Sequence, residues 1–214
     1  TAFNNCNLEK LVLSVAEGSY AESFAKANGI KYELRVSENP EQPEVPVEPE
    51  VPGIPEDALY SGACGESANW YIDAAGTLGI VGSGEMTDYA SYKEVPWYEY
   101  RAQIKSVVIG ADITDLTPYL LRGAAKCESV TFAEGSQITT IEKCSIYYMS
   151  ALKEIVLPES VTTIEKFAFA YSTGLEKVYI PERDGCYINS IKRINLNFGG
   201  VYEKISNLYG RIGY

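Results

Sequence analysis

The amino-acid sequence predicts a β-rich α/β solenoid with short helical turns, and three observations support this fold class. Short strand-like runs recur at nearly constant intervals. A second type of run, with an apolar-polar-polar-apolar pattern, lies between them. Each unit also holds too few apolar residues to close a core of its own, so the units have to stack and share one core.

The repeat is defined by two sets of runs with matching intervals. The first set ends at positions separated by 23, 25 and 23 residues and comprises residues 107–109, 130–132, 155–157 and 178–180. The second set, at 113–116, 138–141 and 161–164, has intervals of 25 and 23 residues. This spacing predicts an array of about three to four repeats over residues 105–181.

Side chains in a β-strand alternate between two faces, so each strand-like run has an inner and an outer set. The inner set is Val107, Ile109, Val130, Phe132, Ile155, Leu157, Val178 and Ile180. The outer set forms the candidate binding face and comprises Ser106, Val108, Ser129, Thr131, Glu154, Val156, Lys177 and Tyr179. Between the runs, residues 164–169 predict a short helical turn in which Ala168 and Phe169 fill the far side of the core.

A Pro/Glu-rich segment divides the chain. Residues 36–56 contain six Glu, no Lys or Arg, and a proline at every third position from Pro40 to Pro55. A three-residue period matches polyproline II, which predicts a stiff, self-repelling linker between two folded parts. The alternative interpretation is that this segment is a ligand for a proline-recognising domain.

The regions on either side of this linker predict caps. Ser19, Glu22 and Gly29 have the spacing of a helix N-cap, a capping box and a C-cap, and a strand-like run follows at 30–34. Residues 57–104 alternate apolar and polar positions between Gly- and Asp-containing turns, which predicts β-hairpins whose core includes Trp70 and Trp97. Residues 182–214 predict a diverged terminal repeat or a C-terminal cap.

Residues 164–181 resemble the repeat unit of the BspA-like leucine-rich-repeat proteins of bacterial cell surfaces. Ala168-Phe169, Leu175, Val178 and Ile180-Pro181 follow the pattern of that unit, with Ser172 at a position where the family often has Cys. The resemblance implies that residues 1–35 are the last repeat and the helix-strand cap of a first array, and that 57–104 cap a second array. It further implies an exported bacterial protein, secreted or at the cell surface, and a chain that begins inside a repeat.

The composition excludes several kinds of chemistry. The chain has no histidine, and the Gly82-x-Gly84 pair lacks the third glycine of a dinucleotide-binding motif. The five cysteines are too widely spaced for a zinc or redox motif, and we expect them to be small buried residues, with one disulfide as the alternative. The sequence therefore predicts no catalytic residues, no metal site and no cofactor.

Charge and tyrosine content narrow the expected partners. A net charge of −11 disfavours nucleic acid, and no apolar run is long enough to insert into a membrane. Tyrosine stands out with 17 residues against six Phe, and some of these residues are expected to contribute to an interface. We expect a non-catalytic adhesion protein that binds an extracellular protein or glycan. A structural spacer in a surface stalk is the first alternative, and a polysaccharide-acting enzyme is the second.

Overall fold

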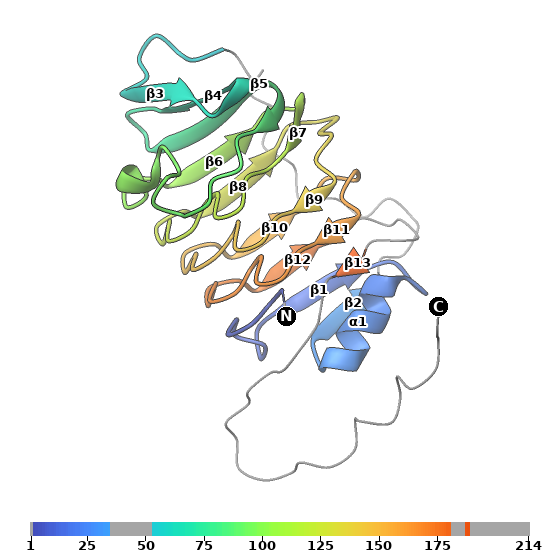
Figure 1. The fold of residues 1–214 in the computed structure, drawn as a ribbon. Helices are drawn as coiled ribbons and strands as arrows, with labels where there is room; N and C mark the ends of the chain where they lie inside the picture. The colour runs from blue at the N-terminus through green and yellow to red at the C-terminus, as the bar shows by residue number, and fades with distance from the viewer. Residues whose placement is uncertain (1, 35–52, 181–186, 189–214) are drawn as a thin grey trace.

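The computed structural model describes residues 2–34, 53–180 and 187–188. In these residues the chain forms a stack of coils whose strands lie side by side (Figure 1). The stack runs from strand β3 (Tyr60–Ala63) at one end to strand β2 (Lys31–Leu34) and helix α1 (Tyr20–Asn28) at the other (Figure 1). We call this arrangement the repeat stack.

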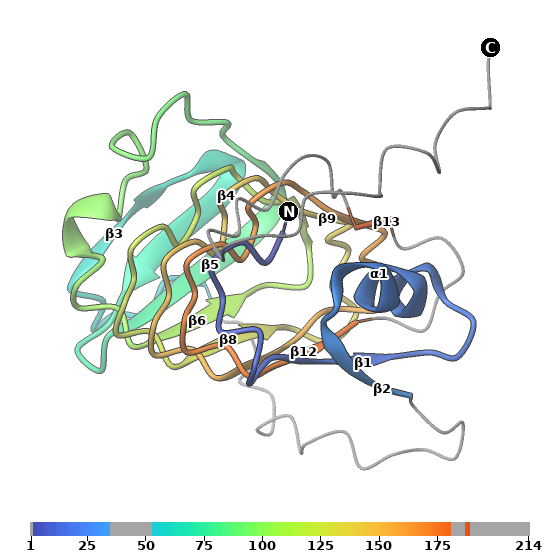
Figure 2. The ribbon, with the colours of Figure 1, turned by 90° about the horizontal axis from the view of Figure 1, so that it is seen from below.

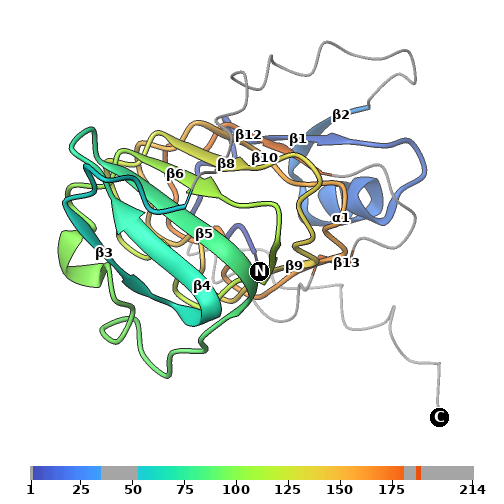
Figure 3. The same ribbon diagram turned by 90° about the horizontal axis from the view of Figure 1, so that it is seen from above.

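One end of the repeat stack is closed by an antiparallel sheet. Strands β3 (Tyr60–Ala63), β4 (Gly65–Ile72) and β5 (Thr77–Met86) pair in that order. Strand β5 then pairs in parallel with β6 (Ser106–Ile109), with Leu78 opposite Val107. The hairpin sheet therefore supplies the first strand against which the repeats stack, and it covers this end when viewed from above (Figure 3).

The repeats contribute two sets of parallel strands. In the first set, β6 pairs with β8 (Ser129–Phe132), and β10 (Glu154–Val156) pairs with β12 (Lys177–Tyr179). In the second set, β9 (Thr140–Ile141) pairs with β11 (Thr163–Ile164) and β11 with β13 (Tyr187–Ile188), while β7 (Ile113–Asp115) pairs with β5. The strands of both sets fall on the runs that the sequence periodicity predicts, apart from β13, which lies beyond the last of these runs.

Burial follows the predicted alternation in the first set of strands. The inner residues from Val107 to Ile180 are buried, apart from Phe132, which is half-buried. The apolar side chains of successive coils form a single cluster that extends from the hairpin sheet to the opposite end. The shared core that the repeat requires is therefore present.

The turns between the two sets of strands differ from the prediction. Ala168 and Phe169 are buried as expected, but residues 166–169 form hydrogen-bonded turns and no helix. Phe167 has a φ of 64° and Tyr171 a φ of 63°, and a left-handed backbone at these two positions interrupts a helix. Among the described residues, the helices are α1 and a short 3₁₀ segment, Tyr98–Tyr100.

The N-terminal segment lies at the end of the repeat stack opposite the hairpin sheet. Strand β1 (Val12–Val15) pairs in parallel with β12 on one side and with β2 (Lys31–Leu34) on the other. Figure 2 shows β12, β1 and β2 side by side, with α1 next to them. Residues 2–34 thus lie against the repeats in the structure, because β12 offers an edge that a further parallel strand can pair with.

Helix α1 (Tyr20–Asn28) begins and ends where the sequence predicts. The Ser19 hydroxyl accepts a hydrogen bond from the Glu22 amide at 3.1 Å, and Gly29 adopts a φ of 64° as the C-cap. The Glu22 carboxylate accepts from the Gly18 amide at 2.6 Å, one residue earlier than in a standard capping box. The helix covers the outermost coil.

The two tryptophans lie in the core beneath the hairpin sheet, as predicted. Their ring centroids are 5.8 Å apart, and the Trp97 side chain is 1% exposed. The Trp97 indole N–H donates a hydrogen bond of 2.7 Å to the carbonyl of Leu120, which fixes the hairpin sheet to the first repeat turn. A sugar-stacking role for these rings is therefore excluded by their burial.

Four cysteines, Cys6, Cys64, Cys127 and Cys144, are buried free thiols, in agreement with the expected packing role. Burial raises the pKa of Cys6 and of Cys127 to about 12, so neither thiol ionises near neutral pH. Cys186, the linker at 36–52 and the predicted terminal repeat at 182–214 lie outside the described residues, apart from β13.

Candidate binding surface

The predicted binding face lies on the outer side of the first set of strands, which belong to two sheets, one with β6 and β8 and one with β10 and β12. Strand register places Ser106 next to Ser129 and Val108 next to Thr131. The corresponding positions on β10 and β12 are also neighbours, with Glu154 beside Lys177 and Val156 beside Tyr179. These eight side chains are half-buried or exposed, and we call them the strand face.

The strand face is chemically mixed. Its β6 and β8 half consists of small hydroxyl and aliphatic side chains, which offer little contact area. At the other end, the Lys177 ammonium pairs with the Glu33 carboxylate and lies 4.7 Å from the centroid of the Tyr179 ring. The hydrogen bond that the Lys177 ammonium donates to the Glu33 carboxylate raises the pKa of Lys177, so this ammonium stays charged while it holds the terminal strands together.

A second surface runs along the turns and is rich in Tyr and Arg. Its members come from the hairpin region and from three successive turns, and their side chains contact one another without a gap. We call this surface the tyrosine–arginine stripe; it comprises Tyr92, Tyr98, Arg101, Tyr119, Arg122, Tyr147, Tyr148 and Tyr171.

Arg122 is the centre of this stripe. Its guanidinium carbon lies 4.4 Å from the ring centroid of Tyr92, 4.7 Å from that of Tyr147 and 5.9 Å from that of Tyr119. A cation over an aromatic face is stabilised by roughly 0.5–1 kcal/mol at exposed sites. The guanidinium therefore connects rings that come from three separate segments of the chain.

The stripe extends from this centre in both directions. On the hairpin side, the ring centroids of Tyr92 and Tyr98 are 5.0 Å apart, and Arg101 lies 3.8 Å over the Tyr98 ring. On the opposite side, Tyr147 and Tyr171 have centroids 5.1 Å apart. The rings support each other, so the stripe is pre-organised.

The most exposed rings of the stripe occupy strained backbone positions. Tyr148 and Tyr171 are 55% and 38% exposed, and their φ angles are 62° and 63°. Two other coils have a small residue at the equivalent position. In the turn before Tyr148 it is Gly123, with a φ of 81°, and in the terminal coil it is Asn5, with a φ of 57°. Gly and Asn adopt this left-handed conformation readily, whereas a Tyr there costs of order 1 kcal/mol or more.

A row of carboxylates lies on another side of the repeat stack. Burial raises the pKa of Glu142, and the charges of Asp115, Glu165 and Asp88 add to the shift. Burial also raises the pKa of Asp115, with a contribution from Asp88 and Glu85. Glu142 and Glu165 occupy equivalent positions in successive repeats, each directly after the last residue of a short strand.

The repeat region has a clear counterpart among known families. The sequence model described as "BspA type Leucine rich repeat region" matches residues 97–197 in 6 copies. The repeat region belongs to the BspA-type leucine-rich repeat family. A comparison with curated proteins found no match.

Two solved structures are similar to this BspA-type chain. A leucine-rich repeat protein from Eubacterium ventriosum is 22% identical with a TM-score of 0.41, and the match covers 56% of this chain and 44% of that one. A leucine rich cell surface protein from Faecalibacterium prausnitzii is 15% identical with a TM-score of 0.29, and the match covers 59% and 44%. The match thus spans less than half of the length of each of these proteins.

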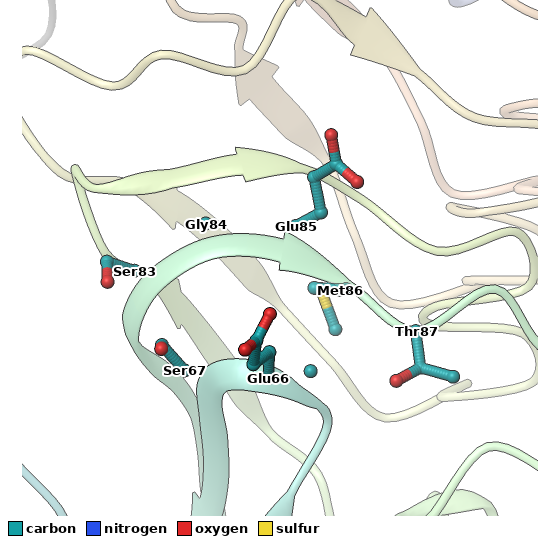
Figure 4. A pocket seen from close by; sticks show the side chains of 8 residues that line it. Glu66, Ser67, Ser83, Gly84, Glu85, Met86 and Thr87 are labelled. Atoms are coloured by element: carbon teal, nitrogen blue, oxygen red, sulfur yellow. The ribbon is translucent and has the colours of Figure 1, made fainter.

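A hollow of about 380 Å³ beside the hairpin sheet is open and polar (Figure 4). It is lined by Gly65, Glu66, Ser67, Ser83, Gly84, Glu85, Met86 and Thr87. Figure 4 shows that the Glu66 and Glu85 side chains lie on opposite sides of the β5 ribbon. They therefore do not form a facing pair of carboxylates of the kind that glycoside hydrolysis uses.

The described part of the chain contains neither a cluster of metal-ligating side chains nor a membrane-spanning helix. No group of three or more Cys, Asp or Glu side chains there is arranged to hold a metal ion. No helix there has the length and apolar composition needed to cross a membrane.

The stripe was only partly visible in the sequence. The tyrosine excess and the clusters at 89–100 and 147–148 pointed to this region, but they gave no geometry. Alignment of the repeats places Arg122 at the same position as Tyr147, and Tyr148 at the same position as Tyr171. That alignment was the signal that could have located the stripe before the structure was known.

Proposed function

We propose that this BspA-type leucine-rich repeat chain is a non-catalytic binding protein of the bacterial cell surface, and that it contacts an extracellular protein through the tyrosine–arginine stripe. The family suggests a protein-binding role at the surface, and proteins built from these repeats are generally non-catalytic. A protein partner agrees with the composition of the stripe, because Tyr and Arg are enriched among the residues that dominate protein interfaces.

The observation that carries this proposal is the pair of exposed rings on strained backbone. Tyr148 and Tyr171 place aromatic side chains in solvent at positions where Asn5 and Gly123 satisfy the turn at lower cost. The left-handed backbone recurs at this position in successive coils, so the fold requires the conformation but not an aromatic side chain, and a residue that is strained without need is a mark of a functional position. Neither ring is part of the buried core, so packing does not explain their presence.

The strand face remains a second possible contact surface, and substitutions can separate the two. The full chain is immobilised and probed with a panel of purified extracellular-matrix proteins and with a glycan array. The stripe variant is Tyr148→Asn with Tyr171→Asn, which keeps a residue that tolerates the left-handed backbone. The matched control on the strand face is Ser129→Ala with Thr131→Ala.

The expected result is binding to at least one protein of the panel by the unchanged chain and by the strand-face control. The stripe variant should lose at least tenfold in affinity, because removal of a central aromatic contact commonly costs over 1 kcal/mol. A loss confined to the strand-face control would move the site to that surface. Equal binding by both variants would exclude both surfaces, and a chain that binds nothing on the panel would favour a spacer role.

A further inference from the structure

We propose that the end of the repeat stack is a docking site for the N-terminal segment of a second copy of this chain. The docking site, called the end seat, consists of β12 and the turn at residues 165–176. The docked part, called the terminal segment, is residues 2–34. In the structure the terminal segment of the same chain occupies the end seat, and the proposal is that copies exchange it.

The backbone shows that the terminal segment docks as one further repeat. The amides of Phe169 and Tyr171 donate to the carbonyls of Ala2 and Asn4 at 2.9 and 2.8 Å. One coil earlier, the same two bonds join Ile146 to Ala168 at 2.9 Å and Tyr148 to Ala170 at 3.0 Å. The contact between the segment and the seat therefore reproduces the contact between consecutive repeats.

The side chains follow the same rule. The Phe3 and Phe169 rings are stacked, with centroids 5.2 Å apart and planes at 5°. The Cys6 thiol donates to the carbonyl of Phe169, just as the Ser172 hydroxyl one repeat earlier donates to the carbonyl of Ile146. The terminal segment carries the side chains of a repeat at the positions that stacking requires, so the seat recognises it as a repeat.

Strand pairing completes the seat. The Val12 amide donates to the carbonyl of Glu176 at 2.6 Å, and the Ile180 amide donates to the carbonyl of Ser14 at 3.2 Å. Without the terminal segment, β12 would present these groups as an open sheet edge beside exposed apolar side chains. An edge of this kind is a template for pairing with a strand from another chain.

The path of the chain makes exchange possible. The chain leaves the terminal segment at β2, at one end of the repeat stack, and returns to described structure before β3, at the opposite end (Figure 1). Residues 35–52 join these two points, and the docking contacts described above are made by the terminal segment with β12, the turn before it and Ile180. The docking contacts are therefore the same whether the segment comes from the same copy or from another, and concentration decides between the two. Reciprocal exchange fills both seats and gives a closed dimer.

The test uses two full-length variants, Val12→Cys and Lys177→Cys. These residues are register partners in neighbouring parallel strands, about 4.8 Å apart, which suits a disulfide. The two variants are mixed, unfolded with reductant, refolded together over a range of concentrations and oxidised. A disulfide between positions 12 and 177, read by mass spectrometry of linked peptides, can then form only between copies.

Two controls define the outcomes. The double variant in one chain reports the contact within a copy, and a mixture of Val12→Cys with Ser129→Cys reports chance collisions on the strand face. The proposal expects the 12–177 link in the mixture to exceed the 12–129 link at least tenfold and to rise with concentration. Exchange would be overturned if the double variant links efficiently while the yield of the 12–177 disulfide in the mixture does not exceed that of the 12–129 disulfide. Failure of the double variant to link would also overturn it, because the seat contact itself would be absent.

Discussion

The two ends of the repeat stack are closed in different ways. At the hairpin end, β5 pairs with β6, and Leu78 and Val107 are less than 30 positions apart in the chain. At the other end, β1 pairs with β12, and Val12 is paired with Lys177, a residue from the far side of the chain. At both ends an exposed strand edge is covered by another strand. At the hairpin end this strand is near in sequence, and at the other end it is distant in sequence.

This difference has a consequence for stability. A contact between residues that are near each other in the sequence closes a short loop of the chain. Docking of the terminal segment closes a much longer loop, which costs more conformational entropy. Regions joined by fewer and more distant contacts open at a lower free energy than the rest of the protein. We therefore expect the hairpin end to unfold together with the repeats and the terminal segment to detach first.

The largest expected effect is at the hairpin end. Trp97→Ala removes a buried ring and leaves the carbonyl of Leu120 without its indole donor, and we expect a loss of about 4 kcal/mol in the free energy of unfolding. Urea unfolding followed by far-UV circular dichroism measures this loss as one transition. Trp97→Phe is the control, since it keeps most of the ring volume and should cost less. A loss below 1 kcal/mol for Trp97→Ala would show that the hairpin end is not part of the cooperative unit.

At the opposite end, Phe3→Ala removes one ring of the Phe3–Phe169 stack and should weaken docking by about 3 kcal/mol. The expected result is detachment of the terminal segment while the repeats stay folded. Native-state alkylation measures it, because Cys6 lies in the segment and Cys127 lies within the repeats, and burial raises the pKa of both thiols to about 12.

In the Phe3→Ala variant, Cys6 should react about 100-fold faster than in the unchanged chain, while Cys127 keeps its slow rate. Cys127 thus serves as the internal control for global unfolding. Equal acceleration of both thiols would contradict independent opening of the terminal segment and would make the two ends equivalent.

A smaller effect is expected at the helix that covers the terminal coil. Ser19→Ala removes the hydroxyl that accepts from the Glu22 amide, and loss of an N-cap costs about 1 kcal/mol. Because α1 lies on the terminal segment, the change should accelerate alkylation of Cys6 about fivefold and leave the urea transition of the repeats unchanged. Ser23→Ala, one turn into the helix, is the matched control. A shift of the main transition would instead place α1 in the same cooperative unit as the repeats.

The sequence predicted the local structure of both ends but not the position of the terminal segment. Periodicity located the strands from β6 to β12, and the spacing of Ser19, Glu22 and Gly29 located α1. The pairing of β1 with β12 joins residues that are far apart in the chain, and no local pattern predicts it. Local spacing contains no information on which free edge a repeat will occupy.

For the candidate binding surfaces, too, the sequence predicts the strands but not the turns. Alternation predicts that the residues of the strand face share one side of their strands, since a strand has a period of two, and these residues are less buried than their inner neighbours, apart from Phe132, which is also half-buried. The tyrosine–arginine stripe depends on left-handed turns such as those at Tyr148 and Tyr171, whose backbone no pattern of apolar residues specifies. The turns were expected to be helical, and a helical turn would have directed these rings elsewhere.

The smallest expected effect concerns the acidic row, which includes Glu85 and Asp88 near the hairpin end and Glu165 in a later repeat. Burial raises the pKa of Glu142 above its ordinary value of 4.5, so the folded state holds its proton more tightly than the unfolded state does. Below about pH 4 the group is protonated in both states and has no effect on stability. As the pH rises through the folded-state pKa, the charged form penalises folding, and stability falls.

Glu142→Gln removes this penalty. We expect the variant to be more stable than the unchanged chain at pH 7, by about 0.5 kcal/mol or less, and equally stable at pH 3.5. Urea titrations at several pH values measure the difference, and Glu154→Gln on the strand face controls for the change in net charge. Because the row connects the hairpin end to the repeats, the gain should appear in the main transition while the alkylation of Cys6 is unchanged. A gain confined to Cys6 would place the acidic row in the terminal unit and would reverse the division between the two ends.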